Sequence, residues 1–163
     1  MKIKSLAIHN FRSIKEIKFS LENYTMLVGA NNAGKSNILT ALRIFYEDEI
    51  KFNEKSDFPK FQTEDNESWI EIEYLLTNEE FVQLKEEYKN PNKVLRVRKY
   101  LKSHDKNRVK ANQSNIYGYE DGILSANLFF KNCIINCDPS GLLPSHIATI
   151  FVEFPTKCHS LVI

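Results

Sequence analysis

Apolar and polar residues alternate over the start of the chain. Leu6 and Ile8 fall on one side of a predicted strand, and Ile17 and Phe19 fall on one side of a second. Residues 10–13 form the turn between them. The pattern therefore predicts two short strands at the N-terminus, joined by a turn.

The next segment changes from alternation to a continuous apolar run. Residues 24–28 are almost entirely apolar and end at Gly29, which is typical of a strand buried on both faces at the centre of an α/β sheet. From Ser36 onward apolar positions recur at helical spacing, which predicts a helix of about ten residues. Its apolar positions are Ile38, Leu39, Leu42 and Phe45.

The middle of the chain has regular patterns separated by polar segments. Residues 69–76 alternate cleanly, as in a strand that covers a core on one face. Thr77 opens a capping box for a helix that we expect to run to about Tyr88. Residues 93–102 form another alternating strand, and a short hairpin is expected around residues 120–122.

The composition is that of an ordinary globular domain. The chain has 163 residues, of which 42% are hydrophobic and 26% are charged, and this length suits one compact domain. No apolar run approaches the roughly 20 residues that span a bilayer. The three cysteines are an odd number, which argues against a disulfide framework. We therefore expect a cytoplasmic protein with no membrane partner.

The net charge of +1 averages two opposed blocks. Between residues 47 and 80, acidic residues outnumber basic ones by 12 to 3. The first part of this block, residues 47–68, has no clear period and is predicted to be a surface excursion. Between residues 93 and 110, basic residues outnumber acidic ones by 8 to 1. The charge is therefore locally strong although it is globally balanced.

Two interpretations of the basic strand are open. In the first, the two arginines of the strand face Glu71 and Glu73 across a sheet, where opposite charges stabilise the pairing. In the second, the basic side chains follow the phosphate backbone of double-stranded DNA. The side chains concerned are Arg96, Arg98, Lys99 and Lys102.

The strongest chemical signal is the glycine loop, residues 29–36. It matches the G-x-x-x-x-G-K-[ST] pattern of a phosphate-binding (Walker A) loop at every fixed position. Lys35 is placed to reach the β and γ phosphates, and the hydroxyl of Ser36 is placed to coordinate Mg²⁺. The loop predicts binding of a nucleoside triphosphate with magnesium, with ATP as the first choice. Its residues are Gly29, Ala30, Asn31, Asn32, Ala33, Gly34, Lys35 and Ser36.

Residues 6–14 and 24–28, together with the glycine loop, resemble the N-terminal lobe of ABC-type ATPases of the SMC and RecF kind. The double asparagine in the loop is most similar to the ATPase domain of the OLD (overcoming lysogenization defect) family. The resemblance implies an α/β P-loop NTPase fold of ABC/SMC-head type. In this fold a mixed sheet is followed, after the loop, by one main helix.

The resemblance also implies roles and partners. Arg12 is implied to contact nucleotide phosphate or a neighbouring subunit, and Asn31 to shape the loop. A solvated turn arginine is the alternative for Arg12. The implied mechanism is ATP-driven dimerisation, as a homodimer or with a partner ATPase head, coupled to DNA processing or phage defence. OLD proteins fuse this ATPase to a C-terminal Toprim nuclease.

Other parts of that machinery have no counterpart in the sequence. Hydrolysis in these ATPases uses an apolar strand ending in Asp-Glu (Walker B) and a Ser-Gly-Gly signature from the partner. Neither occurs here, and no Toprim acidic cluster is found. Asp138 is the nearest substitute for the Walker B carboxylate, but its apolar run ends in Asp-Pro and not in Asp-Glu. Gln62 is a candidate for the magnesium-sensing glutamine, although no motif fixes it and an ordinary loop glutamine is the favoured interpretation. We expect the chain alone to hydrolyse ATP negligibly.

The end of the chain, residues 131–163, is irregular because prolines interrupt its short apolar runs. We expect residues 1–130 to form the ATP-binding lobe and residues 131–163 to be an unassigned, non-native or truncated tail. The tail also holds four potential zinc ligands, although their spacing fits no common site and free thiols are the default. These are Cys133, Cys137, Cys158 and His159.

Three functions are compatible with these features. The first is the ATP-binding portion of an OLD-like or RecF-like ATPase. The second is a non-catalytic nucleotide-sensing interaction module, which differs from the first only in whether a partner completes it. A small stand-alone P-loop kinase or GTPase is less favoured, because neither a lid nor the Asn-Lys-x-Asp motif of GTPases is found.

Overall fold

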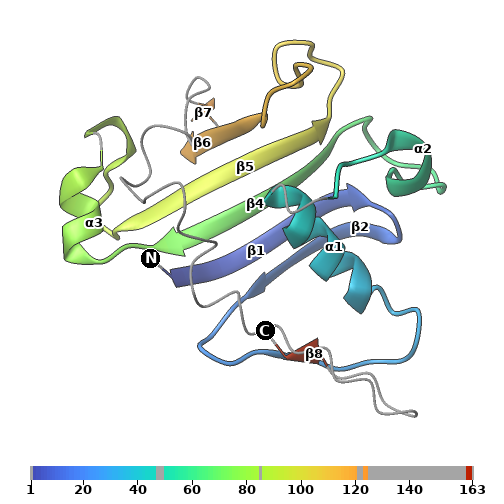
Figure 1. The fold of residues 1–163 in the computed structure, drawn as a ribbon, viewed down its shortest axis with the longest axis horizontal. Coiled ribbons are helices and arrows are strands. Elements are labelled where there is room, and N and C mark those ends of the chain that lie inside the picture. Colours follow the sequence, from blue (N-terminus) through green and yellow to red (C-terminus); the bar gives the residue numbers. More distant parts are fainter. Residues whose placement is uncertain (1, 47–49, 85, 121–122, 125–160, 163) are drawn as a thin grey trace.

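The computed structural model describes residues 2–46, 50–84, 86–120, 123–124 and 161–162. Most of the strands and the main helix expected from the pattern are present (Figure 1). In chain order the elements are β1 (Lys2–Phe11), β2 (Ile14–Ser20), β3 (Met26–Leu27), α1 (Lys35–Phe45), α2 (Glu54–Asp57), β4 (Ser68–Leu75), α3 (Asn78–Gln83), the 3₁₀ turn η1 (Glu86–Tyr88), β5 (Val94–Lys102), β6 (Ile116–Glu120), β7 (Ile123–Leu124) and β8 (Leu161–Val162).

Six strands form one sheet in the order β2-β1-β4-β5-β6-β7. Every pairing recorded among the described residues is antiparallel. In this register Leu6 of β1 lies between Phe19 of β2 and Ile72 of β4. Since side chains alternate along a strand, this register separates an apolar face from a charged face. Helix α1 lies across the apolar face (Figure 1).

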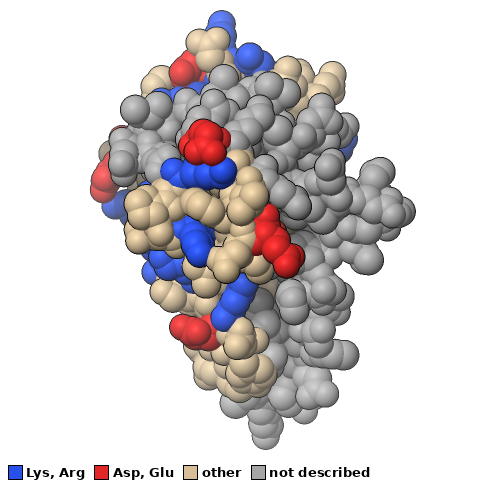
Figure 2. Space-filling view, turned by 90° about the vertical axis from the view of Figure 1, so that its left-hand side faces the viewer, with Lys and Arg blue, Asp and Glu red and all other residues tan. Residues whose placement is uncertain are grey.

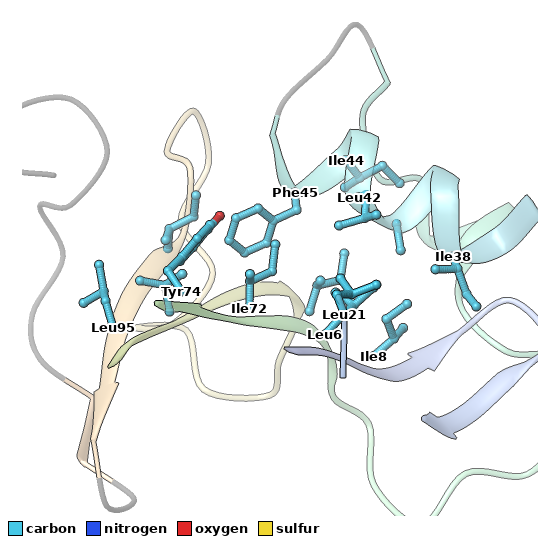
Figure 3. Packing of buried hydrophobic residues seen from close by; sticks show 14 of the residues in the cluster. Leu6, Ile8, Leu21, Ile38, Leu42, Ile44, Phe45, Ile72, Tyr74 and Leu95 are labelled. Atoms are coloured by element: carbon cyan, nitrogen blue, oxygen red, sulfur yellow. The ribbon is translucent and has the colours of Figure 1, made fainter. Parts of the chain in front are cut away.

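The core fills the space between α1 and the sheet (Figure 3). Leu6, Ile8 and Ile72 are completely buried on the sheet side. Leu42 and Phe45 project from α1 onto them at the predicted helical spacing. This packing fixes α1, and therefore the glycine loop in front of it, relative to the sheet.

The predicted capping box starts α3. The Thr77 hydroxyl accepts a hydrogen bond from the Glu80 amide, and the Glu80 carboxylate accepts one from the Thr77 amide. The helix is shorter than expected and ends at Gln83 instead of near Tyr88. Leu84 takes an extended backbone (φ −71°, ψ 144°) and buries its side chain in the core. Tertiary packing therefore outweighs the local helical preference at this point.

The segment before the glycine loop departs from expectation. Residues 24–28 were predicted to be a buried central strand, but β3 contains only Met26 and Leu27 and lies outside the six-stranded sheet. Tyr24 is 62% exposed and Val28 is 74% exposed. An apolar strand is buried on both faces only when neighbours flank it, and the one pairing partner of β3 among the described residues is β8.

The C-terminal part of the chain is described only in pieces. β6 and β7 form the expected hairpin, with Glu120 opposite Ile123. β8 pairs with β3, so two residues of the tail contact the strand before the glycine loop. The boundary near residue 130 and the non-native tail remain predictions. The four potential zinc ligands and Asp138 lie outside the described residues. Within the described ranges, no helix is long and apolar enough to cross a bilayer.

Candidate nucleotide-binding site

The glycine loop connects β3 to α1 and lies on the surface. Gly34 occupies the N-cap position of α1 with φ 89°, a conformation that L side chains rarely adopt. A Cβ atom at this position would also lie 3.3 Å from the hydroxyl oxygen of Ser13. Ahead of it, the Ala33 amide donates to the Ala30 carbonyl at 3.2 Å, which closes a turn. Glycine is therefore required where the loop enters the helix.

Lys35 is the first residue of α1, and its side chain folds back over the loop. Its ammonium donates to the carbonyl oxygens of Gly29, at 2.7 Å, and of Ala30, at 2.8 Å. The charge thus lies against the main chain of the loop at Gly29 and Ala30. Because a lysine ammonium is a mobile point charge, it can exchange carbonyl oxygens for phosphate oxygens.

The start of α1 suits an anion. The helix has no side-chain cap and no acidic residue in its first turn. Amide groups at the start of any α-helix lack intrahelical acceptors, and the helix dipole adds positive potential there. Ser36, the second residue of the helix, is exposed at the same place. The chemistry of these groups suits a phosphate with Mg²⁺. The backbone amides and Lys35 can bind phosphate oxygens, and the Ser36 hydroxyl can coordinate Mg²⁺.

Arg12 belongs to the turn between β1 and β2, and this turn contacts the first turns of α1. The Arg12 Nη1 atom lies 3.4 Å from Asn37 Oδ1 and 3.5 Å from Thr40 Oγ1. The Asn37 amide group also donates to the Ser13 hydroxyl at 2.9 Å. The structure therefore brings Arg12 to the helix that follows the glycine loop. Its contact with a phosphate remains a prediction.

Asp57 is a site residue that the sequence pattern did not single out. Its carboxylate accepts a hydrogen bond from Arg12 Nε at 2.9 Å, and its carbonyl oxygen accepts one from the Arg12 amide at 2.7 Å. The turn residue Arg12 is therefore held by an ion pair, and its side chain remains 35% exposed. Asp57 lies in the acidic segment without a clear period, so only the tertiary contact reveals its role.

The acidic segment has a second anchor at Asp65. The Asp65 carboxylate accepts from Asn10 Nδ2 at 2.9 Å and lies 3.1 Å from His9 Nε2, and His9 also contacts Glu16. Burial lowers the pKa of His9, but hydrogen bonds to Glu16 and Asp65 outweigh it and raise the pKa above its usual value. The ring stacks on Trp69, with 5.0 Å between ring centroids. The segment is therefore tied to β1 through Asp65 and to the turn after β1 through Asp57.

The arginines of β5 lie on the charged face of the sheet. The register places Arg98 opposite Glu71 and Arg96 opposite Glu73. The shortest distances are 2.6 Å between Arg98 Nη2 and Glu71 Oε2, and 2.8 Å between Arg96 Nη2 and Glu73 Oε1. The cross-strand pairing considered from the sequence is therefore present. Figure 2 shows basic and acidic side chains interspersed on the side of the molecule at which α3 lies.

The two lysines assigned to DNA binding differ in environment. Lys99 is buried on the apolar face, and its ammonium donates to the Phe45 carbonyl oxygen at the end of α1, at 3.2 Å. Lys102 pairs with Glu54 at 2.9 Å and lies 3.8 Å from the centre of the Phe58 ring. DNA contact by the basic strand remains a prediction. Gln62 is exposed in the acidic segment, and its magnesium-sensing role is equally untested.

The glycine loop is followed by α1, and α1 packs on the six-stranded sheet. This arrangement is that of a P-loop ATPase domain. Residues 1–139 match the AAA ATPase domain family, and the chain belongs to this family. The expected α/β P-loop fold with one main helix after the loop is therefore confirmed.

Two curated proteins are similar to part of the chain. The chain is 39% identical to Endonuclease GajA of Bacillus cereus (strain VD045) over 66 residues, which are 39% of this chain and 11% of that protein. It is 49% identical to Old nuclease of Escherichia phage P2 over 43 residues, which are 26% of this chain and 7% of that protein. The match thus spans about a tenth or less of each relative. The resemblance to proteins of the OLD family is confirmed.

One solved structure was obtained in work on ATP-driven dimerisation and DNA-stimulated activation of SMC ATPases. It superposes with a TM-score of 0.49 at 14% sequence identity, and the superposition covers 77% of this chain and 73% of that one.

Proposed function

We propose that this chain binds MgATP through the glycine loop and serves as the ATP-binding part of an OLD-like ATPase that is coupled to DNA processing or phage defence. Membership of the AAA ATPase domain family supports ATP as the ligand. The two relatives, named as an endonuclease and a nuclease, support the coupling to DNA. In this proposal Lys35 and the loop amides hold the β and γ phosphates, and Ser36 contributes one oxygen to Mg²⁺.

The observation that carries the proposal is the position of the Lys35 ammonium. It lies within hydrogen-bond distance of two loop carbonyl oxygens, and Lys35 is itself the first residue of α1. The left-handed Gly34 brings the chain into the helix at this point, so lysine charge, loop amides and helix dipole act on the same volume. A phosphate group is the ligand whose charge suits that arrangement.

Assembly is part of the proposal. In ATPases of the SMC kind two heads enclose nucleotide between the loop of one head and the signature of the other, and we propose the same use of this chain in the cytoplasm. A homodimer or a partner ATPase head then supplies the groups that complete the site. The loop, Arg12 and α1 supply the half that binds phosphate.

Calorimetric titration with MgATP tests the proposal through Lys35→Ala. We expect the affinity to fall by at least about a hundredfold, because the substitution removes the charge that faces the phosphates. Lys60→Ala is the matched control, since Lys60 is an exposed lysine outside the loop, and its affinity should equal that of the wild type. Equal affinity of wild type and Lys35→Ala would remove the proposal.

Two further titrations refine the assignment. Ser36→Ala should retain binding of ATP in the presence of EDTA but lose most of the gain that Mg²⁺ provides, because the hydroxyl ligand is absent. Titration with MgGTP separates the alternatives, since a clear preference for GTP would support a stand-alone GTPase instead.

A further inference from the structure

Asp57 is buried beside Arg12, although most described residues of its acidic segment are exposed. Its side chain is only 4% exposed. One carboxylate oxygen accepts from Arg12 Nε, and the other accepts from the Asn53 amide at 2.8 Å, at the start of α2. A buried carboxylate is tolerated because both oxygens are hydrogen-bonded and one partner is cationic. This residue therefore links α2 to the turn that carries Arg12.

Asp57 holds Arg12 at two points. The side-chain pair restrains the guanidinium, and the bond from the Arg12 amide to the Asp57 carbonyl oxygen restrains the turn. Arg12 has φ 51°, an uncommon value for a residue with a side chain, so its backbone depends on such contacts. The orientation of Arg12 is thus set from α2, which lies more than forty positions later in the sequence.

The Arg12 guanidinium uses only some of its N–H groups in hydrogen bonds within the described part of the chain. Nε is bound by Asp57, and Nη1 makes long contacts with Asn37 and Thr40 on α1. Within the described part of the chain, Nη2 has no hydrogen-bond partner, and the Arg12 side chain is 35% exposed. An arginine held by one edge presents its remaining N–H groups in a fixed plane, which suits phosphate oxygens.

We propose that Asp57 is a positioning residue that orients Arg12 toward the phosphates of the nucleotide at the glycine loop. The inference rests on the proposed function, because it requires that the loop bind a nucleotide. Asp57 itself does not touch the ligand. It lowers the cost of binding because the guanidinium does not have to be ordered when phosphate arrives.

The negative charge of Asp57 also repels a phosphate bound nearby. Whether MgATP affinity rises or falls when this charge is removed therefore distinguishes repulsion from positioning. If charge alone mattered, removal of the carboxylate would strengthen phosphate binding. If orientation matters more, removal weakens it. Replacement of Asp57 by Asn, which retains nearly the same shape and one acceptor oxygen, therefore separates the two effects.

The test is a double-mutant cycle with MgATP as the probe, measured by calorimetry on Asp57→Asn, Arg12→Ala and the double variant. We expect Asp57→Asn to weaken binding about tenfold when Arg12 is present and by less than about twofold when it is absent. Equal effects in both backgrounds, no effect, or tighter binding would overturn the inference. Absence of MgATP binding by the wild type would instead refute the proposed function.

Two controls separate positioning from stability. Asn53→Ala removes the side-chain cap of α2 but keeps the backbone amide that binds Asp57, so it should lower the melting temperature without weakening MgATP binding. Arg12→Lys keeps the charge but has no Nε donor for Asp57, so it should bind MgATP as weakly as Arg12→Ala. If Asp57→Asn does not fold, this variant decides: wild-type affinity in Arg12→Lys would overturn the inference.

Discussion

Replacement of Glu71 by Gln tests whether the charged face of the sheet is structural. The Glu71 side chain is 6% exposed and the Arg98 side chain is 14% exposed. Arg98 donates from both Nε and Nη2 to Glu71 Oε2, at 2.9 and 2.6 Å, and its guanidinium lies 3.8 Å from the centre of the Trp69 ring. The substitution keeps the shape of the side chain and removes the charge, so the partly buried Arg98 loses its ion pair with Glu71.

The magnitude follows from the distance and the burial. At about 2.8 Å and an effective dielectric constant near 20, the attraction between the two charges is about 6 kcal/mol. Desolvation of the pair offsets much of this, and removal of one member of a buried pair costs about 3–5 kcal/mol. Glutamine retains a neutral acceptor, so we expect a loss of about 3 kcal/mol. For a domain of this size that corresponds to a fall in melting temperature of about 10 °C.

Urea denaturation of Glu71→Gln, Arg98→Met and the double variant measures this loss and the coupling of the two residues. Glu64→Gln is the control, because the Glu64–Lys15 pair is largely exposed, and it should leave the unfolding midpoint unchanged. The double variant should be more stable than Glu71→Gln alone, since no unpaired charge remains. A loss below about 0.5 kcal/mol for Glu71→Gln would place the pair among ordinary surface salt bridges and refute the reasoning.

Three further predictions concern DNA, pH and turnover. For DNA, Lys102→Gln should reduce the slope of log Kobs against log salt concentration by about one unit, and an unchanged slope would leave the basic strand purely structural. For pH, burial raises the pKa of Glu73, but the hydrogen bond from Ser5 and the charges of Arg96 and Lys18 outweigh this and lower it below its usual value. The stability from Glu73 is therefore complete above its unfolded-state pKa and disappears as the pH falls through its lower folded-state pKa. The urea midpoint of the wild type should fall more steeply over this acidic range than that of Glu73→Gln. For turnover, phosphate release by the chain alone should stay below about 1 per second, and a faster rate would reveal a water-activating group that the sequence does not indicate.

Local patterns were enough to predict many of the elements and the phosphate-binding loop. Strand alternation at Leu6 and Ile8 depends only on the twofold period of a strand, and the capping box at Thr77 depends on hydrogen bonds within four residues. The glycine loop could be recognised because its chemistry needs particular residue types at fixed spacing. Signals of this kind lie within one short segment, so they can be read without knowledge of the fold.

Contacts between distant segments were decided only by the tertiary structure. Residues 24–28 have the composition of a buried strand, yet β3 is short and flanked by exposed residues, because burial depends on which strands lie beside it. The sequence left open whether Arg98 faces a carboxylate or a nucleic acid, because the register of β4 and β5 decides this. Asp57 has no motif at all, and its position beside Arg12 exists only because the chain returns to the β1–β2 turn. Local patterns thus predicted most of the elements and the phosphate-binding loop, whereas the packing of those elements decided which strand is buried and which charges meet.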